Sequence, residues 1–332
     1  MRIKIAFLCY LLSALIFGLI GSPVFAKAAP ATAKIVFSGN RELLENRDIY
    51  LMDTDGQGVI NLTNHRADDV QPVFSPTGEQ ILFCSDRDRF PFSYDLYLMN
   101  ADGSDVRRVF PKSQERFTPT WSPDGKQIAY VRVKLGVASL HIAPVDGKKE
   151  DRVTIGIMPV WSPDGTEIAF INRRLKHPRY ITVLNVRTSR AKFFFPPDAP
   201  AWLRHPAWSP DGKKLAFTWM RVEPERENVN KEALYIVNRD GTGLHQLIDE
   251  EGPPVNRPVW SPAGDELLYQ RPDREFKHVH IFKMSVVRGL ATQLTDQTVW
   301  NSLGDWFDPA YALPVSPQPQ LLTTLWGELK RK

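Results

Sequence analysis

Trp121–Gly125 reads Trp-Ser-Pro-Asp-Gly, and the same five residues recur at Trp161–Gly165 and Trp208–Gly212. Near copies stand at Phe74–Gly78 and Trp260–Gly264. The serines of the five copies, at positions 75, 122, 162, 209 and 261, are 47, 40, 47 and 52 residues apart. A motif that returns every 40 to 50 residues is typical of repeat proteins, β-propellers among them.

The chemistry of the motif indicates a tight turn that follows a short strand. Pro presets φ at the second turn position, Asp bonds the turn backbone, and Gly accepts positive φ. A Pro-x-Trp segment precedes each turn, as at Pro119–Trp121, and we expect it to form the first strand of a blade. The Trp is a large apolar side chain suited to packing between neighbouring sheets.

Three further strands are expected in each of six units. An apolar run comes first, a second run follows a variable loop, and a Gly turn leads to a third run that often ends in Leu-Thr. Runs of four to six residues rich in Val, Ile, Tyr and Phe are typical of strands, and Asp-Gly between two of them indicates a hairpin. The six sets begin near Ile35, Ile81, Ile128, Ile168, Leu215 and Leu267.

The ends of the chain are expected to close the ring. The first set has no strand before it, whereas a degenerate motif at Gly304–Pro309 has no set after it. A strand at about 305–308 that joins the N-terminal strands would complete a sixth blade and leave no open edge. The prediction is an all-β protein: a six-bladed β-propeller of four-stranded blades spanning 27–310, after a signal peptide at 1–26 and before a Pro-containing tail at 311–332.

These motifs resemble the TolB-like β-propeller repeat, a WD40-like repeat of the Trp-Ser-Pro-Asp-Gly type. Asp48–Asp53, Leu62-Thr63, Trp121–Gly125 and Ile128–Tyr130 carry the resemblance, which covers about residues 33–310. The resemblance implies a propeller scaffold, and fold alone does not set function. TolB itself has an α/β domain before its propeller, which we do not find here, so we expect a relative rather than TolB itself. Related propellers precede protease domains, but no Gly-x-Ser-x-Gly motif is present.

The N-terminus is typical of a secretory signal peptide. Arg2 and Lys4 precede an apolar stretch from Ile5 to Ile20, and small residues precede an expected cut after Ala26. An uncleaved membrane anchor is the alternative. Only Cys84 remains after the cut, which excludes an internal disulfide in the mature chain and suits a periplasmic or secreted protein. The net charge of +4 does not indicate a nucleic-acid binder.

The residues just before the strand-forming prolines are expected to converge on the mouth of the central channel. A protein or peptide partner, or a small polar ligand, would bind there; a water-lined channel without a ligand is the alternative. The candidate binding residues are Gln71, Arg116, Thr118, Met158, Arg204, His205, Asn256, Arg257 and Asp305.

We found no catalytic constellation, no metal site and no cofactor motif in the sequence. The leading hypothesis is therefore an exported, non-enzymatic, monomeric propeller that binds a protein or peptide over its channel face. The alternative is a propeller-type carbohydrate lyase or lactonase-like enzyme with a metal in the channel, held by His205 with Asp305 or Asp69. A propeller that cooperates with a separately encoded peptidase is a third hypothesis. The tail would form a short helix on the ring or a partner-binding segment.

Overall fold

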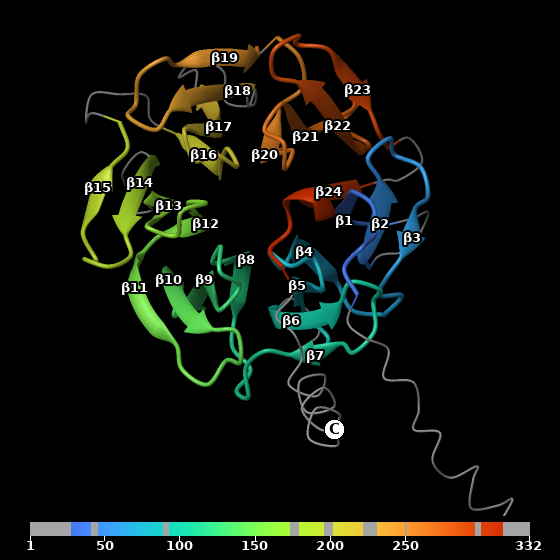
Figure 1. Ribbon diagram of the computed structural model, residues 1–332, viewed down its shortest axis with the longest axis vertical. Helices are drawn as coiled ribbons and strands as arrows, with labels where there is room; N and C mark the ends of the chain where they lie inside the picture. The colour runs from blue at the N-terminus through green and yellow to red at the C-terminus, as the bar shows by residue number, and fades with distance from the viewer. Residues whose placement is uncertain are drawn as a thin grey trace, which may run out of the picture.

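Six β-sheets stand around a central axis like the blades of a propeller (Figure 1). The computed structural model describes residues 28–40, 46–88, 93–172, 179–195, 202–221, 231–249, 251–295 and 300–314. The expected signal peptide and most of the expected tail, from residue 315 onward, lie outside the described residues. Within them, no helix is long and apolar enough to cross a membrane. The prediction of a six-bladed, four-stranded propeller is confirmed.

Each blade has four antiparallel strands, numbered here from the channel outward. Blade 1 contains β24 (Trp300–Phe307), β1 (Lys34–Asn40), β2 (Asp48–Asp53) and β3 (Ile60–Asn61); blade 2 contains β4 (Asp69–Phe74), β5 (Gln80–Ser85), β6 (Asp95–Asn100) and β7 (Arg107–Arg108). Blade 3 contains β8 (Arg116–Trp121), β9 (Gln127–Lys134), β10 (Val137–Pro144) and β11 (Asp151–Ile155); blade 4 contains β12 (Ile157–Trp161), β13 (Glu167–Asn172), β14 (Tyr180–Asn185) and β15 (Ala191–Phe193). Blade 5 contains β16 (Leu203–Trp208), β17 (Lys214–Arg221), β18 (Lys231–Asn238) and β19 (His245–Ile248); blade 6 contains β20 (Asn256–Trp260), β21 (Glu266–Pro272), β22 (Val279–Ser285) and β23 (Ala291–Gln293).

The ring closes where the sequence predicted. The last strand, β24, pairs antiparallel with β1 and becomes the inner strand of blade 1. It begins at Trp300, five residues before the expected start, and continues through a bulge at Gly304. A Cβ on Gly304 would lie 2.5 Å from the carbonyl oxygen of Pro72 and 2.7 Å from that of Val36, so only glycine allows this close approach. A single parallel pair, Val279 with Trp300, joins blade 6 to blade 1.

The repeated motif forms the turn that its sequence predicts. In blade 3 the Ser122 hydroxyl donates to Asp124 at 2.6 Å, Asp124 accepts from the N–H of Lys126, and Gly125 has φ of +69°. The preceding Trp121 is buried and its indole N–H donates to the carbonyl of Val73 in blade 2 at 3.4 Å. The motif therefore joins the inner strand of a blade to its second strand, and in blade 3 its Trp also binds the neighbouring blade 2.

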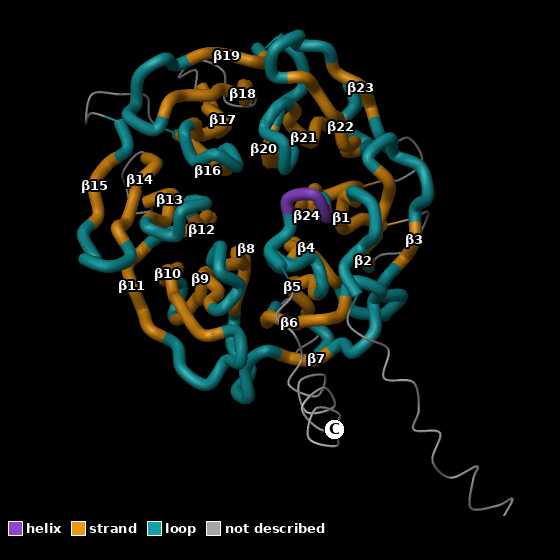
Figure 2. The backbone as a smooth tube through the Cα atoms, in the orientation of Figure 1, coloured by secondary structure: helices purple, strands orange, loops and turns teal. Residues whose placement is uncertain are grey.

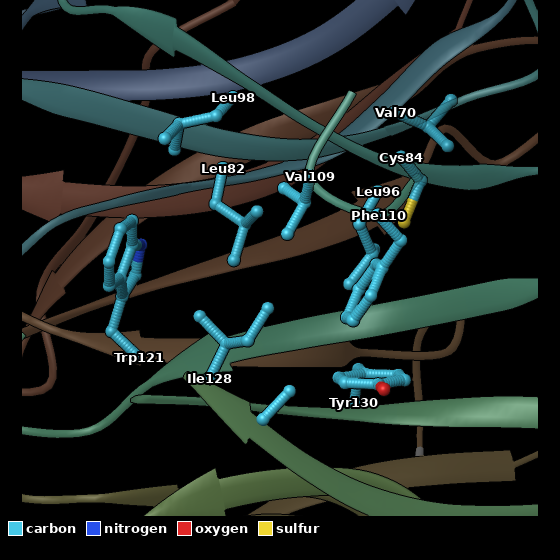
Figure 3. Packing of buried hydrophobic residues seen from close by; sticks show 11 residues of the cluster. Val70, Leu82, Cys84, Leu96, Leu98, Val109, Phe110, Trp121, Ile128 and Tyr130 are labelled. Carbon is cyan, nitrogen blue, oxygen red and sulfur yellow. The ribbon is translucent and has the colours of Figure 1, made fainter. Parts of the chain in front are cut away.

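The core lies between the faces of adjacent blades. Figure 3 shows Val70, Leu82 and Leu96 of blade 2 packed towards Ile128 and Tyr130 of blade 3. Truncating one such side chain to Ala costs about 2–5 kcal/mol. Cys84 belongs to the same cluster and is fully buried, and burial raises the pKa of its thiol. It is a packed strand residue rather than a reactive thiol.

Candidate functional site

Five residues with the same backbone geometry surround the central channel. Each lies directly before the proline of an inner strand, has φ between 47° and 56°, and stands where the pairing with the second strand shifts register. We call them the ring residues: Gln71, Thr118, Met158, His205 and Arg257. All five line the channel. They stand near the end of the propeller at which inner strands begin and second strands end, which we call the upper face.

The left-handed backbone of the ring residues is costly. A non-glycine residue adopts it at a cost of about 1–2 kcal/mol, and a β-branched residue such as Thr118 is especially rare there. A bulge inserts one extra residue and turns a side chain away from the regular alternation of the strand. Five copies of this arrangement therefore direct five side chains to one place. Repeated local strain of this kind is concentrated at functional sites in proteins.

The channel encloses a cavity of about 580 Å³. Its wall is mainly apolar, because prolines and aromatic residues alternate with the ring residues. Each ring residue is followed by a proline that also lines the cavity: Pro72, Pro119, Pro159, Pro206 and Pro258. At the other end the short helix Pro309–Tyr311 lies beside β24, as Figure 2 shows, and Tyr311 contributes to the wall. An apolar cavity with a few polar groups at one end is typical of a ligand-binding site.

The sixth position of the ring belongs to Leu303, two residues before the candidate residue Asp305. Phe37 in β1 corresponds to Phe83 in β5, because each lies opposite a tyrosine of the third strand. Leu303 pairs with Phe37, whereas Asp305 pairs with Val36, as Val73 pairs with Leu82 in blade 2. Asp305 thus lies two residues further along the inner strand. Asp305 still lines the channel, and the other blades carry small or apolar residues at the equivalent position.

His205 is the ring residue with the most developed surroundings. Its Nδ1 lies 3.2 Å from the hydroxyl of Thr218, which donates to the buried carboxylate of Glu232 at 2.5 Å. Burial lowers the pKa of His205 to about 4; the charges of Arg257 and Arg204 act in the same direction, and Glu232 opposes the lowering only in part. Burial alone would raise the pKa of Glu232, but His205, 3.7 Å away, and the hydrogen bond from Thr218 bring it below its ordinary value. His205 is therefore neutral at pH 7, with an ionised carboxylate behind it.

Arg257 is the one lysine or arginine among the described residues that line the channel. Burial lowers its pKa to about 10, and the nearby charges of Arg47 and Arg204 act in the same direction. The guanidinium remains protonated at neutral pH. A permanent cation in an apolar channel favours a ligand that brings a carboxylate or another acceptor.

Gln71 and Asp305 connect blades rather than leaving their acceptor atoms free. The side-chain oxygen of Gln71 accepts the backbone N–H of Thr118 at 2.8 Å. The two carboxylate oxygens of Asp305 accept the N–H of Phe74 at 3.0 Å and of Trp306 at 2.8 Å. Burial raises the pKa of Asp305 to about 6, while these hydrogen bonds act against the rise.

Three candidate residues do not line the channel. Arg116 is buried between blades 2 and 3, where its guanidinium bonds Asp95 at 2.8 Å and stacks on Phe110 at 3.8 Å. Arg204 and Asn256 directly precede ring residues, and alternation along the strand turns them towards the faces of the blades. Arg204 lies 3.7 Å from Glu232. These three side chains are therefore not part of the cavity wall, although the charge of Arg204 acts on the neighbouring His205 and Arg257.

Sequence reasoning missed Thr218, Glu232 and Leu303. Thr218 and Glu232 are internal strand residues with no motif of their own, and they reach the site only through the pairing of β17 with β16 and β18. Their polar character in otherwise apolar strands was the only available signal. Leu303 could not be placed because the spacing of the last motif differs from that of the other five.

The channel residues do not fit a metal centre. No three His, Cys, Asp or Glu ligands converge there among the residues whose placement is described. Both oxygens of Asp305 accept backbone N–H groups, and His205 already faces Thr218. Asp69 is fully buried and forms an ion pair with Arg87 at 2.6 Å. A protein metal site normally needs three or four such ligands.

Comparison with known proteins places these observations in context. The TolB beta propeller domain family matches residues 12–158 and 134–310. The Tol-Pal system protein TolB of Syntrophotalea carbinolica is 36% identical over 59 residues, which are 18% of this chain and only 13% of that relative's length.

Two solved structures share the architecture. TolB from Acinetobacter baumannii superposes with a TM-score of 0.70 at 18% identity, over 88% of this chain and 70% of that one. An oligogalacturonate lyase in complex with manganese superposes with a TM-score of 0.50 at 17% identity, over 81% of this chain and 74% of that one. At these identities the likeness concerns the fold alone.

Proposed function

The chain belongs to the TolB beta propeller domain family, and from that premise we propose that it is an exported, non-enzymatic, monomeric propeller that binds a protein or peptide partner over its upper face. The observation that carries the proposal is the set of five strained ring residues. Strain of about 1–2 kcal/mol at each of five equivalent positions needs a benefit that an empty channel does not supply.

The lining of the channel favours a partner segment with a particular chemistry. Proline and aromatic walls suit apolar side chains, whereas Arg257 suits one carboxylate at the mouth. His205 is neutral at pH 7 and adds a donor or acceptor rather than a second charge. We therefore propose that an extended, mostly apolar segment with one acidic group enters the channel.

Site-specific crosslinking tests the proposal directly. A photo-reactive amino acid is placed at Thr118 or Met158, and the protein is irradiated in its native host. A matched control carries the same group at Leu290, which is 70% exposed on the outer hairpin of blade 6. The expected result is one discrete protein adduct from the two channel positions and none from Leu290. The same adducts from all three positions, or none from Thr118 and Met158, would reject the site.

A double variant measures the contribution of the charged residues. Arg257→Gln with His205→Gln should abolish the adduct formed from Thr118, because both groups lie in the wall that the partner touches. Arg187→Gln with His245→Gln, two exposed positions in the outer parts of blades 4 and 5, serves as the matched control and should leave the adduct unchanged. Thermal unfolding of both variants excludes loss through misfolding.

The second candidate function is a propeller-type lyase. The similar architecture of the oligogalacturonate lyase and the His205–Thr218–Glu232 arrangement favour it. The channel residues do not fit the metal that such an enzyme holds in that structure. Incubation with oligogalacturonate and detection of unsaturated products by ultraviolet absorbance distinguish the two. Product formation that is lost in His205→Gln would replace the binding proposal with the enzymatic one.

Export is the remaining part of the proposal. It rests on the charged start and the apolar stretch of residues 1–26. N-terminal sequencing of the protein from its host should begin at Lys27, which would place it in the periplasm or outside the cell. A chain that begins at Met1 and fractionates with membranes would support the anchored alternative.

A further inference from the structure

Asp273, His278 and His280 form a group of metal-ligating side chains outside the cavity wall. They belong to the hairpin that joins β21 to β22 in blade 6, at the upper face. Each side chain offers a ligand atom, and the three atoms lie within 4.8 Å of one another. All three residues are partly buried. None of them lines the channel.

Strand geometry brings these three side chains together. The N–H of Asp273 donates to the carbonyl of His278 at 2.8 Å, so the two residues stand opposite each other at the end of the hairpin. His280 follows two residues later, and alternate residues of a strand point to the same face. Asp273 Oδ2 and His278 Nδ1 are 2.7 Å apart, and the two imidazole centroids are 6.0 Å apart. The backbone thus directs one carboxylate and two imidazoles into one space.

His280 supplies an independent observation in favour of a ligand site. Its Nδ1 is buried and has no hydrogen-bond partner among the described residues. A buried polar nitrogen without a hydrogen-bond partner costs the folded protein about 1–3 kcal/mol of stability relative to a nitrogen that has one. A bound ion would satisfy that nitrogen and would be shared with the atoms that now join Asp273 to His278.

The positive groups near this space do not fill it. Arg271 pairs with His280 across the hairpin, but its Nε donates to the carbonyl of Pro253 at 2.7 Å, which holds the guanidinium against the 252–253 segment. Lys277 forms an ion pair with Glu275 at 2.6 Å. The second oxygen of Asp273 accepts the N–H of Lys277 and so fixes the carboxylate.

We propose that Asp273, His278 and His280 bind one divalent transition-metal ion, with water completing the coordination. Two imidazoles and one carboxylate suit Zn²⁺ and its neighbours in the first transition row, whereas Mg²⁺ and Ca²⁺ prefer oxygen ligands alone. Zinc bonds of 2.0–2.2 Å place tetrahedral ligand atoms about 3.4 Å from one another, so the more distant atoms of the group must approach, whereas Asp273 Oδ2 and His278 Nδ1, now 2.7 Å apart, must separate slightly. Side chains at the end of a hairpin have room to make that movement.

The site lies beside the closure of the ring. Val279, between the two histidines, pairs with Trp300 at the start of β24, and its carbonyl accepts from the side chain of Asn301 at 2.8 Å. An ion held here would fix the hairpin at the point where the last strand meets blade 6. Zn²⁺ is therefore expected to raise the midpoint of thermal unfolding as well as to bind.

The experiment uses the untagged full chain, treated with a chelator and dialysed against Zn²⁺. Elemental analysis should find close to one equivalent of zinc in the wild type and in the control His245→Gln, which changes an exposed histidine in blade 5. His280→Gln and Asp273→Asn should each lose at least nine-tenths of the bound zinc and the zinc-dependent rise in the unfolding midpoint. Unfolding midpoints without metal check that the variants fold.

Two outcomes would overturn the proposal. The first is wild-type protein that retains no zinc, or His280→Gln that retains as much as the wild type. The second is loss of the ion in His205→Gln, which would place the metal in the channel instead. Equal retention of Mg²⁺ would contradict the assignment to a transition metal.

Discussion

The carboxylate of Asp305 accepts the backbone N–H of Phe74 at 3.0 Å, and this bond ties the last strand of the chain to the inner strand of blade 2. The second oxygen accepts the N–H of Trp306. Burial nevertheless raises the pKa of Asp305 to about 6. The closure of the ring therefore contains a carboxylate that is costly to ionise.

Replacing Asp305 by Asn is expected to stabilise the protein at neutral pH. The pKa of Asp305 is about 6 in the folded protein and 3.8 in the unfolded chain, so the folded state binds the proton more tightly. The contribution of the protonated Asp305 carboxyl to the free energy of unfolding is complete below pH 3.8 and is lost as the pH rises through 6. At pH 7 the loss reaches about 3 kcal/mol at most. Asn carries no charge and keeps an oxygen for Phe74 but offers no acceptor to the N–H of Trp306, so we expect a net gain of about 1–2 kcal/mol at pH 7.5.

Urea unfolding of both proteins from pH 4 to pH 8 measures the effect. The difference between Asp305→Asn and wild type should shrink towards zero at pH 4, where the native carboxyl is protonated. Asp102→Asn, in an exposed hairpin turn, is the control and should bring no gain at neutral pH. A difference that does not depend on pH would show that Asp305 titrates normally.

Replacing Arg116 by Met is expected to destabilise the protein strongly. The guanidinium is almost fully buried, and its removal leaves the carboxylate of Asp95 buried without its partner. Breaking a buried ion pair from one side costs about 3–5 kcal/mol. Urea unfolding at pH 7 gives the value. The control is Arg107→Met, whose exposed pair with Asp105 contributes less than about 1 kcal/mol.

The double variant Asp95→Asn with Arg116→Met separates charge from packing. It should recover part of the loss, because no isolated charge remains in the interface between blades. A loss of less than about 1 kcal/mol in Arg116→Met would instead mean that water reaches Asp95 in the native protein.

The blades and their closure could be predicted from sequence because local chemistry determines them. Ser-Pro-Asp-Gly specifies a turn, Asp-Gly specifies a hairpin, and alternating apolar runs specify strands wherever they occur. The unpaired first set and the leftover motif near Trp306 then imply the closing strand. Each of these inferences needs only neighbouring residues and the requirement that sheet edges be covered.

The site was less predictable because it depends on a bulge. Thr118 and Arg116 are two residues apart on one strand, and simple alternation would send both side chains the same way. The positive φ at Thr118 breaks that alternation, so Thr118 faces the channel and Arg116 packs between blades. Partners from other strands, such as Glu232 behind His205, depend on tertiary pairing that no local pattern encodes.

His205 is expected to stay neutral until the pH is well below 6. Its pKa is lowered to about 4 in the folded protein from 6.5 in the unfolded chain, chiefly by burial. As the pH falls, the unfolded chain therefore takes up the proton before the folded protein does. The contribution of neutral His205 to stability is present above pH 6.5 and is lost as the pH falls towards 4. The loss amounts to about 3 kcal/mol at most. NMR titration of the imidazole ring measures the midpoint directly.

His205→Gln identifies the His205 signal and removes this part of the pH dependence. The stability of the variant should fall less than that of the wild type between pH 6.5 and pH 4. A midpoint for His205 at or above 6 would indicate that Glu232 stabilises the imidazolium despite the burial of the ring.

Replacing a ring residue by glycine is expected to raise stability while it weakens binding. Thr118 and Met158 have φ of +47° and +55°, a region that glycine adopts without steric cost. Relief of this strain should bring about 1 kcal/mol in urea unfolding, even though glycine is more flexible in the unfolded chain. Thr120→Gly, on the same strand but outside the bulge, should instead lose about 1 kcal/mol. If Thr118→Gly and Met158→Gly lower stability as Thr120→Gly does, the ring residues are structural. If each variant is more stable than the wild type and no longer forms the adduct from a photo-reactive residue at the other of these two positions, the strain serves binding.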